Sequence, residues 1–84
     1  MKKSLTWSQL DENNWLLICV GYINELPFSA ERAIMTKGII MNPTGVVSST
    51  STYTWRTYTM YKKDGITEED KLYVETIFNN GDTV

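Results

Sequence analysis

The chain has 84 residues, of which 42% are hydrophobic and 21% are charged, and its formal net charge is −2. This composition fits a single globular domain over residues 1–84 and excludes a chain that is disordered throughout. The sequence contains one cysteine and no histidine, which excludes an intramolecular disulfide and the Ser-His and Cys-His nucleophile pairs of hydrolases. Because a domain of this size buries a modest share of its surface, we expect self-association, as a homodimer, to stabilise it.

The sequence indicates a reducing, cytoplasmic setting. Polar residues follow the basic start at 1–3, where a signal peptide would have an apolar core. The longest apolar run, Trp15 to Ile23, is far shorter than the roughly 20 residues that span a bilayer, so no membrane span is expected. A near match to a glycosylation acceptor is blocked by Pro43. A lone thiol without such an acceptor is typical of the cytoplasm.

A β-hairpin is predicted from Leu5 to Ile23. The alternating run SLTWSQL precedes the polar cluster DENN, which suits a turn, and WLLICVGYI is rich in β-branched and aromatic residues. Gly21 lies inside this second strand and suggests a bulge or a close backbone approach. Cys19 lies in the same apolar run, so we expect a small buried side chain that reacts slowly rather than a reactive thiolate.

A short helix and a turn are predicted next. The segment PFSAERAIMTKG offers Ser29 as the N-cap and Gly38 at the point where the helix would end. In GIIMNPTGVV, two apolar runs flank NPTG, in which Pro43 takes the second position of a turn and Gly45 the fourth. We therefore expect two strands joined by that turn.

Residues 50–63 combine threonines, aromatic side chains and three cations without any acid. These residue types fit a long strand, and its alternation places Tyr53, Trp55 and Tyr61 on one face. The other face carries cationic, aromatic and thioether side chains: Arg56, Tyr58, Met60 and Lys62. Because neither face is plainly apolar, we expect this strand at an edge of the sheet or in the wall of a groove.

The last predicted element covers residues 67–79. Thr67 is a candidate N-cap, acids fill the first turn, and Asn80-Gly81 would end a helix. The helix would gather four apolar or aromatic side chains on one face: Tyr73, Val74, Ile77 and Phe78. The alternative is a strand over 71–78, because KLYVETIF also has strong β propensity. We favour the helix. The complete pattern predicts an α+β fold, with an antiparallel sheet of about four to five strands and one or two short helices in one small domain.

The candidate chemical groups indicate neither an enzyme nor a cofactor site. Glu68, Glu69 and Asp70 are consecutive on the predicted helix, so they point in different directions and cannot converge on one metal ion. The glycines do not have the spacing of nucleotide-binding loops. We therefore predict no catalytic residue, no metal and no cofactor.

Charge is distributed unevenly along the chain. Residues 32–63 contain five cations and no acid, a charge of +5, whereas the remainder contains three cations and ten acids, a charge of −7. Such asymmetry suggests a surface that meets an anionic partner. The predicted partner-binding residues lie in this basic, aromatic part of the chain: Tyr53, Trp55, Arg56, Tyr58, Tyr61, Lys62 and Lys63.

Two functions fit these observations. The first is a small protein-binding module, of the inhibitor or adaptor type that phages and mobile elements encode, which docks on a larger protein through an exposed aromatic strand. The alternative is a single-stranded nucleic-acid-binding protein that stacks bases on the aromatic side chains of residues 50–63. We favour the first, because three cations on a strand are few for a phosphate track and the net charge is acidic.

Overall fold

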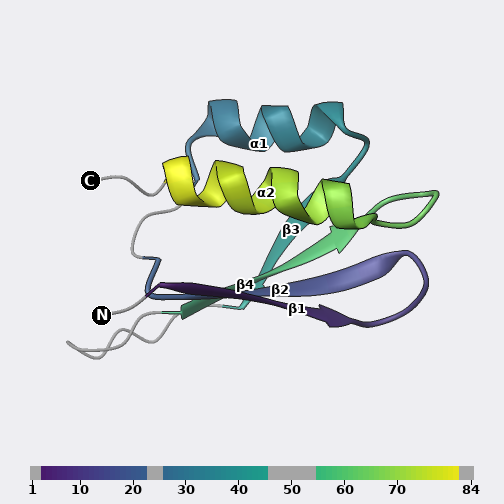
Figure 1. Cartoon of the computed structure of the whole chain (residues 1–84), viewed down its shortest axis with the longest axis horizontal. Coiled ribbons are helices and arrows are strands. Elements are labelled where there is room, and N and C mark those ends of the chain that lie inside the picture. Colours follow the sequence, from purple (N-terminus) through teal and green to yellow (C-terminus); the bar gives the residue numbers. More distant parts are fainter. Residues whose placement is uncertain (1–2, 23–25, 46–54, 82–84) are drawn as a thin grey trace.

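Four strands and two helices make up the described part of this computed structural model, which is residues 3–22, 26–45 and 55–81 (Figure 1). In chain order the elements are β1 (Ser4–Gln9), β2 (Asn14–Val20), α1 (Phe28–Thr36), β3 (Ile40–Gly45), β4 (Trp55–Tyr61) and α2 (Glu68–Gly81). The strands form one antiparallel sheet in the order β1-β2-β4-β3. The predicted α+β class, with an antiparallel sheet and two helices, is confirmed.

The predicted hairpin is confirmed as the antiparallel pair β1 and β2. Its turn is organised by Asp11, whose Oδ1 accepts hydrogen bonds from the backbone N–H groups of Asn13 at 2.8 Å and Asn14 at 2.9 Å. Hydrogen bonds, first from the Asn14 side chain and then from the Asn13 backbone, lower the pKa of Asp11. Gly21 does not form a bulge inside the strand, because β2 ends at Val20 and Gly21 follows with a φ of 84°.

The first helix was predicted with the correct end and the wrong beginning. α1 starts at Phe28, and its N-cap is Pro27 rather than Ser29. Proline suits this position because its ring fixes φ, here at −65°, and its ψ of 155° makes the residue extended. Its carbonyl accepts hydrogen bonds from Ala30 and Glu31. The helix ends as predicted, with Gly38 in the left-handed region at a φ of 81°.

The predicted turn at NPTG is wrong, because β3 runs straight through it from Ile40 to Gly45. Pro43 lies in the strand opposite Tyr58, and the register shifts between Pro43 and Gly45. Proline is tolerated here because β3 is an edge strand, where a missing N–H need not break the ladder. Gly45 lies so close to β4 that an added Cβ would overlap the hydroxyl of Thr57. The second strand of that prediction begins at residue 46, outside the described residues.

The strand predicted at an edge of the sheet is central instead. β4 pairs with β2 on one side and with β3 on the other. Its side chains at Tyr58 and Met60 are buried, at 6% and 0% exposure. Tyr58 packs edge to face against Phe78 of α2, with the ring centroids 5.4 Å apart. Residues 50–54 of the predicted strand lie outside the described residues.

The last element is the predicted helix, and the alternative strand over 71–78 is wrong. Its first turn is capped as the sequence indicates. Thr67 Oγ1 accepts a hydrogen bond from the Asp70 N–H at 3.1 Å, and Asp70 Oδ2 accepts one from the Thr67 N–H at 3.1 Å. This reciprocal pair satisfies two backbone donors that would otherwise lack partners in the first turn.

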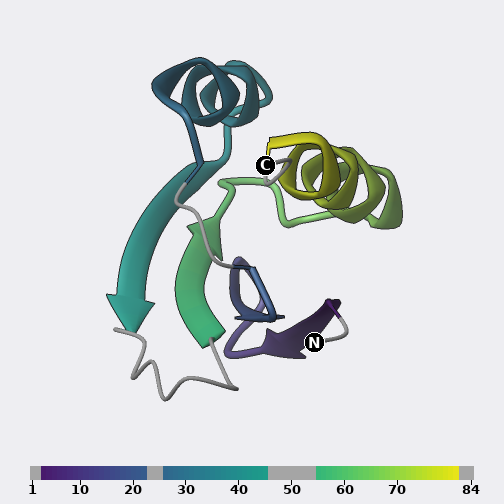
Figure 2. The same ribbon diagram turned by 90° about the vertical axis from the view of Figure 1, so that its left-hand side faces the viewer.

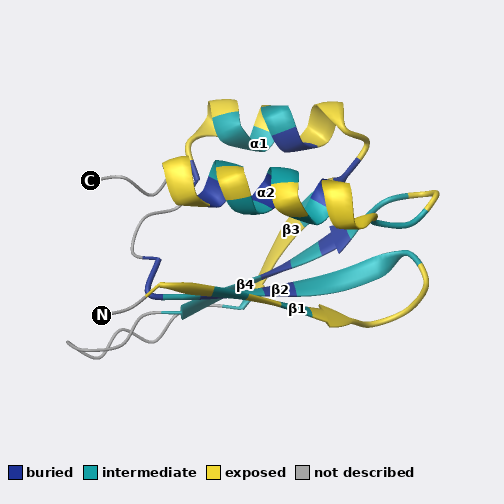
Figure 3. Cartoon of the chain, in the orientation of Figure 1, coloured by how far each residue is buried: buried dark blue, intermediate teal, exposed yellow. Residues whose placement is uncertain are grey.

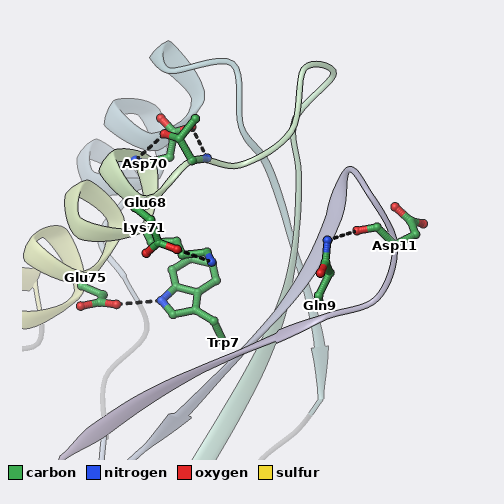
Figure 4. A network of polar contacts seen from close by, with 8 residues as sticks. Trp7, Gln9, Asp11, Glu68, Asp70, Lys71 and Glu75 are labelled. Carbon is green, nitrogen blue, oxygen red and sulfur yellow. Dashed lines mark hydrogen bonds and ion pairs between the residues drawn. The ribbon is translucent and has the colours of Figure 1, made fainter.

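Both helices lie on one side of the sheet (Figure 2). Between the sheet and the helices lies a core of ten buried side chains: Leu17, Cys19, Tyr22, Leu26, Ile34, Ile39, Tyr58, Met60, Val74 and Phe78. Figure 3 shows the same division, with buried residues on the sides of the helices that face the sheet. Polar contacts tie the layers together (Figure 4). The indole Nε1 of Trp7 in β1 donates to Glu75 of α2 at 2.8 Å. Within the helix layer, the Tyr73 hydroxyl of α2 donates to the Ala33 carbonyl of α1 at 3.3 Å.

Cys19 is expected to react slowly with thiol reagents in the folded protein. Its side chain is completely buried in β2, as predicted, so a reagent reaches it only when the structure opens. The rate of modification by an aromatic disulfide at neutral pH should be at least about 100-fold lower for native protein than for urea-unfolded protein. A native rate close to the unfolded rate would contradict this burial.

Candidate functional site

The open face is the side of the sheet that is turned away from the two helices. Every second residue of each strand belongs to it, because side chains alternate between the two faces. The pairing register aligns these residues in four rows across the sheet: Ser4, Val20 and Trp55; Thr6, Ile18 and Thr57; Ser8, Leu16, Thr59 and Asn42; Asn14, Tyr61 and Ile40.

Apolar side chains run through the middle of the open face. β2 contributes Leu16, Ile18 and Val20, which are all half-buried. The aromatic side chains of β4 extend this apolar strip at both of its ends, with Trp55 beside Val20 and Tyr61 beside Asn14. Serine and threonine side chains flank the strip on β1 and β4. The strip is therefore a surface of apolar groups bordered by hydroxyls.

No residue of the open face in the described strands is charged. Ile40, at the β3 side of this face, is 54% exposed. Threonine hydroxyls near β3 are partly used within the sheet, since Thr44 Oγ1 donates to Thr57 Oγ1 at 3.3 Å and Thr59 Oγ1 donates to the Asn42 carbonyl at 3.4 Å. An uncharged face of this kind suits contact with another protein surface, because little desolvation of charge opposes it.

The seven predicted partner-binding residues do not share one surface. Trp55 and Tyr61 lie on the open face, as their alternation with the inward side chains requires. Arg56 and Tyr58 lie on the helix side, opposite Cys19 and Leu17 of β2. Burial of Tyr58 in the core removes it from any contact surface. Tyr53 lies outside the described residues.

The two predicted lysines also have different surroundings. Lys62 Nζ lies 2.7 Å from Asp70 Oδ2, and the two side chains are 25% and 9% exposed. Burial alone would raise the pKa of Asp70, but hydrogen bonds from Lys62 and Thr67 outweigh it and hold that pKa below its ordinary value. Lys63 is exposed in the turn after β4. The cations of residues 50–63 therefore do not alternate with aromatic side chains on one face.

Sequence reasoning missed the apolar part of the open face. Leu16, Ile18 and Val20 belong to the run WLLICVGYI, which is predicted as a strand without a division of its side chains between two faces. A continuous apolar run is typical of a strand that is covered on both faces. Since the two helices cover one face only, that run was the signal that the second face also has an apolar character.

Residues 3–22, 26–45 and 55–81 have neither a metal-binding cluster nor a helix that could span a membrane. There, no three His, Cys, Asp or Glu side chains gather in a way that could hold a metal ion. Within the same residues, neither helix has the length and apolar character needed to cross a membrane. A scan against protein-family models finds no match, and comparisons with curated proteins and with solved structures find none either.

Proposed function

We propose that this chain is a small, non-enzymatic protein-binding module, an inhibitor or adaptor in type, that docks on a larger protein through the open face. One observation carries the proposal. The face presents apolar and aromatic side chains from three strands, no charged residue among its described positions, and no helix over it. Aromatic and aliphatic side chains surrounded by hydroxyls are the residue types that anchor protein interfaces.

The proposed setting is the reducing cytoplasm. Cys19, the one cysteine of the sequence, is completely buried in the core. Free buried cysteines persist where thiols are kept reduced. The binding partner is therefore expected to be a cytoplasmic protein.

A second candidate function, binding of single-stranded nucleic acid, has one observation in its favour. Trp55 and Tyr61 lie on the same face of one strand, where two bases could stack. Its weakness is electrostatic. The open face offers no cation for phosphates among its described residues, Arg56 lies on the opposite side and Lys62 is paired with Asp70. We therefore rank it below protein binding.

The proposal is tested with an aspartate on the open face. Ile40→Asp adds a charge at a position that is already 54% exposed, so it should leave the fold intact and weaken partner binding by about tenfold or more. The matched control is Leu72→Asp, an equivalent change at an apolar position on α2 that is 64% exposed, and it should bind as wild type does. The measurement is retention of protein partners from lysate, with and without nuclease, on immobilised wild type and each variant.

A titration with a fluorescent oligonucleotide at low salt separates the two functions. We expect no saturable binding. Saturable binding that Trp55→Ala weakens by about 1–3 kcal/mol would reverse the order of the two proposals. Equal loss of a protein partner by Ile40→Asp and Leu72→Asp would also contradict docking through the open face.

A further inference from the structure

The two edges of the sheet are protected to different degrees. β3, at one edge, contains Pro43 and a register shift, and both features hinder the addition of a further strand. β1, at the other edge, has the sequence SLTWSQ, with no proline, no charged residue and regular pairing to β2 along its length. Natural sheets blunt an edge that must stay unpaired. β1 contains no proline, no charged residue and no register shift that would hinder pairing with a further strand.

The hydrogen-bond pattern identifies which backbone groups of β1 face outward. The Leu10 N–H donates to the Asn14 carbonyl at 2.9 Å, so this pair is a hydrogen-bonded one. Because hydrogen-bonded and non-hydrogen-bonded pairs alternate in an antiparallel ladder, the even-numbered residues of β1 bond to β2. The bond from the Lys62 N–H to the Asn13 carbonyl, on the other side of β2, fits the same alternation. Leu5, Trp7 and Gln9 therefore direct their N–H and C=O groups away from the sheet.

We propose that this edge pairs with β1 of a second copy of the chain, antiparallel and about a two-fold axis at Trp7. In this register Leu5 of one copy bonds with Gln9 of the other, and the two Trp7 residues bond with each other. All the outward backbone groups of β1 then have partners, and the two sheets become one continuous sheet. Neighbouring registers would leave some of these groups without a strand partner.

Charge at the ends of β1 favours the antiparallel orientation. Lys3 precedes the strand and Asp11 follows it. In the proposed register the Lys3 end of one β1 lies beside the Asp11 end of the other, at both ends of the contact, whereas an in-register parallel pairing would place like charges together. The Lys3 ammonium lies 5.3 Å from the centroid of the Tyr22 ring, so its attraction to Asp11 acts through space rather than by a direct bond. The charges at the two ends of β1 are thus complementary when two copies pair antiparallel.

Side chains along the edge also match across the two-fold axis. Thr6 of one copy lies opposite Ser8 of the other on the open face, and small hydroxyl side chains form favourable cross-strand pairs. On the helix side, the bond from Trp7 to Glu75 holds the indole against α2. The open faces of the two copies lie on the same side, so the dimer doubles the width of the face that is proposed to bind a protein. The pairing itself does not depend on what that face binds.

The register is tested by disulfide cross-linking between copies. A non-hydrogen-bonded pair has Cα atoms about 4.5 Å apart, within the range of about 4.4–6.8 Å that a disulfide bridges. Thr6 and Ser8 are exposed and lie opposite each other in the proposed dimer. We therefore expect a mixture of Thr6→Cys and Ser8→Cys chains to form a mixed disulfide dimer in high yield under mild oxidation. The control mixture of Ser4→Cys and Ser8→Cys, whose positions are offset by two residues, should cross-link at least about fivefold less.

Sedimentation tests whether the contact forms without a cross-link. Because a contact between two strands is small, we expect wild-type protein to be dimeric at about 100 µM and to dissociate on dilution. Gln9→Pro removes one outward N–H and should raise the dissociation constant by about tenfold or more, whereas Gln9→Ala should leave it nearly unchanged. Circular dichroism reports whether each variant is folded.

Three results would overturn the proposal: monomeric wild-type protein at all concentrations, equal yields in the two cysteine mixtures, or a dimer that folded Gln9→Pro retains. If Gln9→Pro does not fold, the cysteine mixtures alone decide. Failure of the open-face proposal has a different signature, because Ile40→Asp would then keep its protein partner while the β1 contact still forms.

Discussion

Replacing Phe78 with alanine is expected to lower the free energy of unfolding by about 3–5 kcal/mol. The side chain is 2% exposed and joins α2 to two other parts of the core. Its ring packs edge to face against Tyr22, with centroids 6.1 Å apart, and against Tyr58 at 5.4 Å. Since small domains have a total stability of roughly 5–15 kcal/mol, this loss would remove a large share of it.

Urea denaturation of the Phe78→Ala variant, followed by circular dichroism, measures this loss. The matched control is Leu72→Ala, which truncates an apolar side chain on the same helix that is 64% exposed. We expect the control to change stability by less than about 0.5 kcal/mol. Similar losses in the two variants would contradict the orientation of α2 over the sheet.

The second large effect is expected at Asp70, where Asp70→Asn should cost about 1–3 kcal/mol near neutral pH. Its carboxylate accepts hydrogen bonds from Lys62 at 2.7 Å and from the Thr67 N–H at 3.1 Å, so one side chain links the end of β4 to the first turn of α2. The substitution removes the charge while keeping the size of the side chain. It leaves the Lys62 ammonium, which is 25% exposed, without its counter-ion.

The Asp70 carboxylate also makes the free energy of unfolding depend on pH. Although burial opposes ionisation, the bonds from Lys62 and Thr67 hold the pKa of Asp70 below its ordinary value of 3.8. A carboxyl group whose pKa is depressed by folding contributes stability above its unfolded pKa, and that contribution is lost as the pH falls through the folded value. Wild type should therefore lose more stability than Asp70→Asn between about pH 6 and pH 2.

Two lysine variants sharpen this test. Lys62→Met removes the partner of Asp70 and should reduce the acid dependence, whereas Lys63→Met, at the exposed neighbouring position, should leave it as in wild type. The measurement is the urea midpoint of each protein at a series of pH values. Equal pH profiles for wild type and Lys62→Met would show that the ion pair does not set the pKa of Asp70.

Elements whose signals are local could be predicted from the sequence. The hairpin has a polar turn centred on Asp11, and α2 has its cap at Thr67. In each case neighbouring residues supply the hydrogen bonds that begin or end the element. The position of a strand within a sheet is different, because it depends on partners that are distant in sequence. Pro43 therefore suggested a turn although it lies in an edge strand, and β4 suggested an edge although it is central.

The candidate site could likewise be predicted only where its signals are local in the sequence. Trp55 and Tyr61 were placed correctly on a common face because alternation along one strand is a local property. The same alternation placed Arg56 and Lys62 on the other face, but they were grouped with the aromatic side chains as partner-binding residues because they are close in sequence. Their actual neighbours are set by the packing of α2, which takes Lys62 to Asp70. The charge of a sequence segment thus shows only which residues the segment contains. The surroundings of each charged side chain follow from the tertiary structure.

The strand order β1-β2-β4-β3 has a consequence for the route by which the chain folds. β1 and β2 are joined by a short turn and can form early, but β2 finds its second neighbour only when Trp15 meets Met60, far along the chain. Bringing such distant residues together costs chain entropy before any stabilising contact forms. This cost slows folding. During synthesis on a ribosome, one side of β2 would stay unpaired until residues 55–61 had emerged. β4 would then have to insert between β2 and β3. The sheet is therefore completed late in synthesis. Until then, the edge of β2 that later pairs with β4 is exposed to incorrect pairing between two nascent chains.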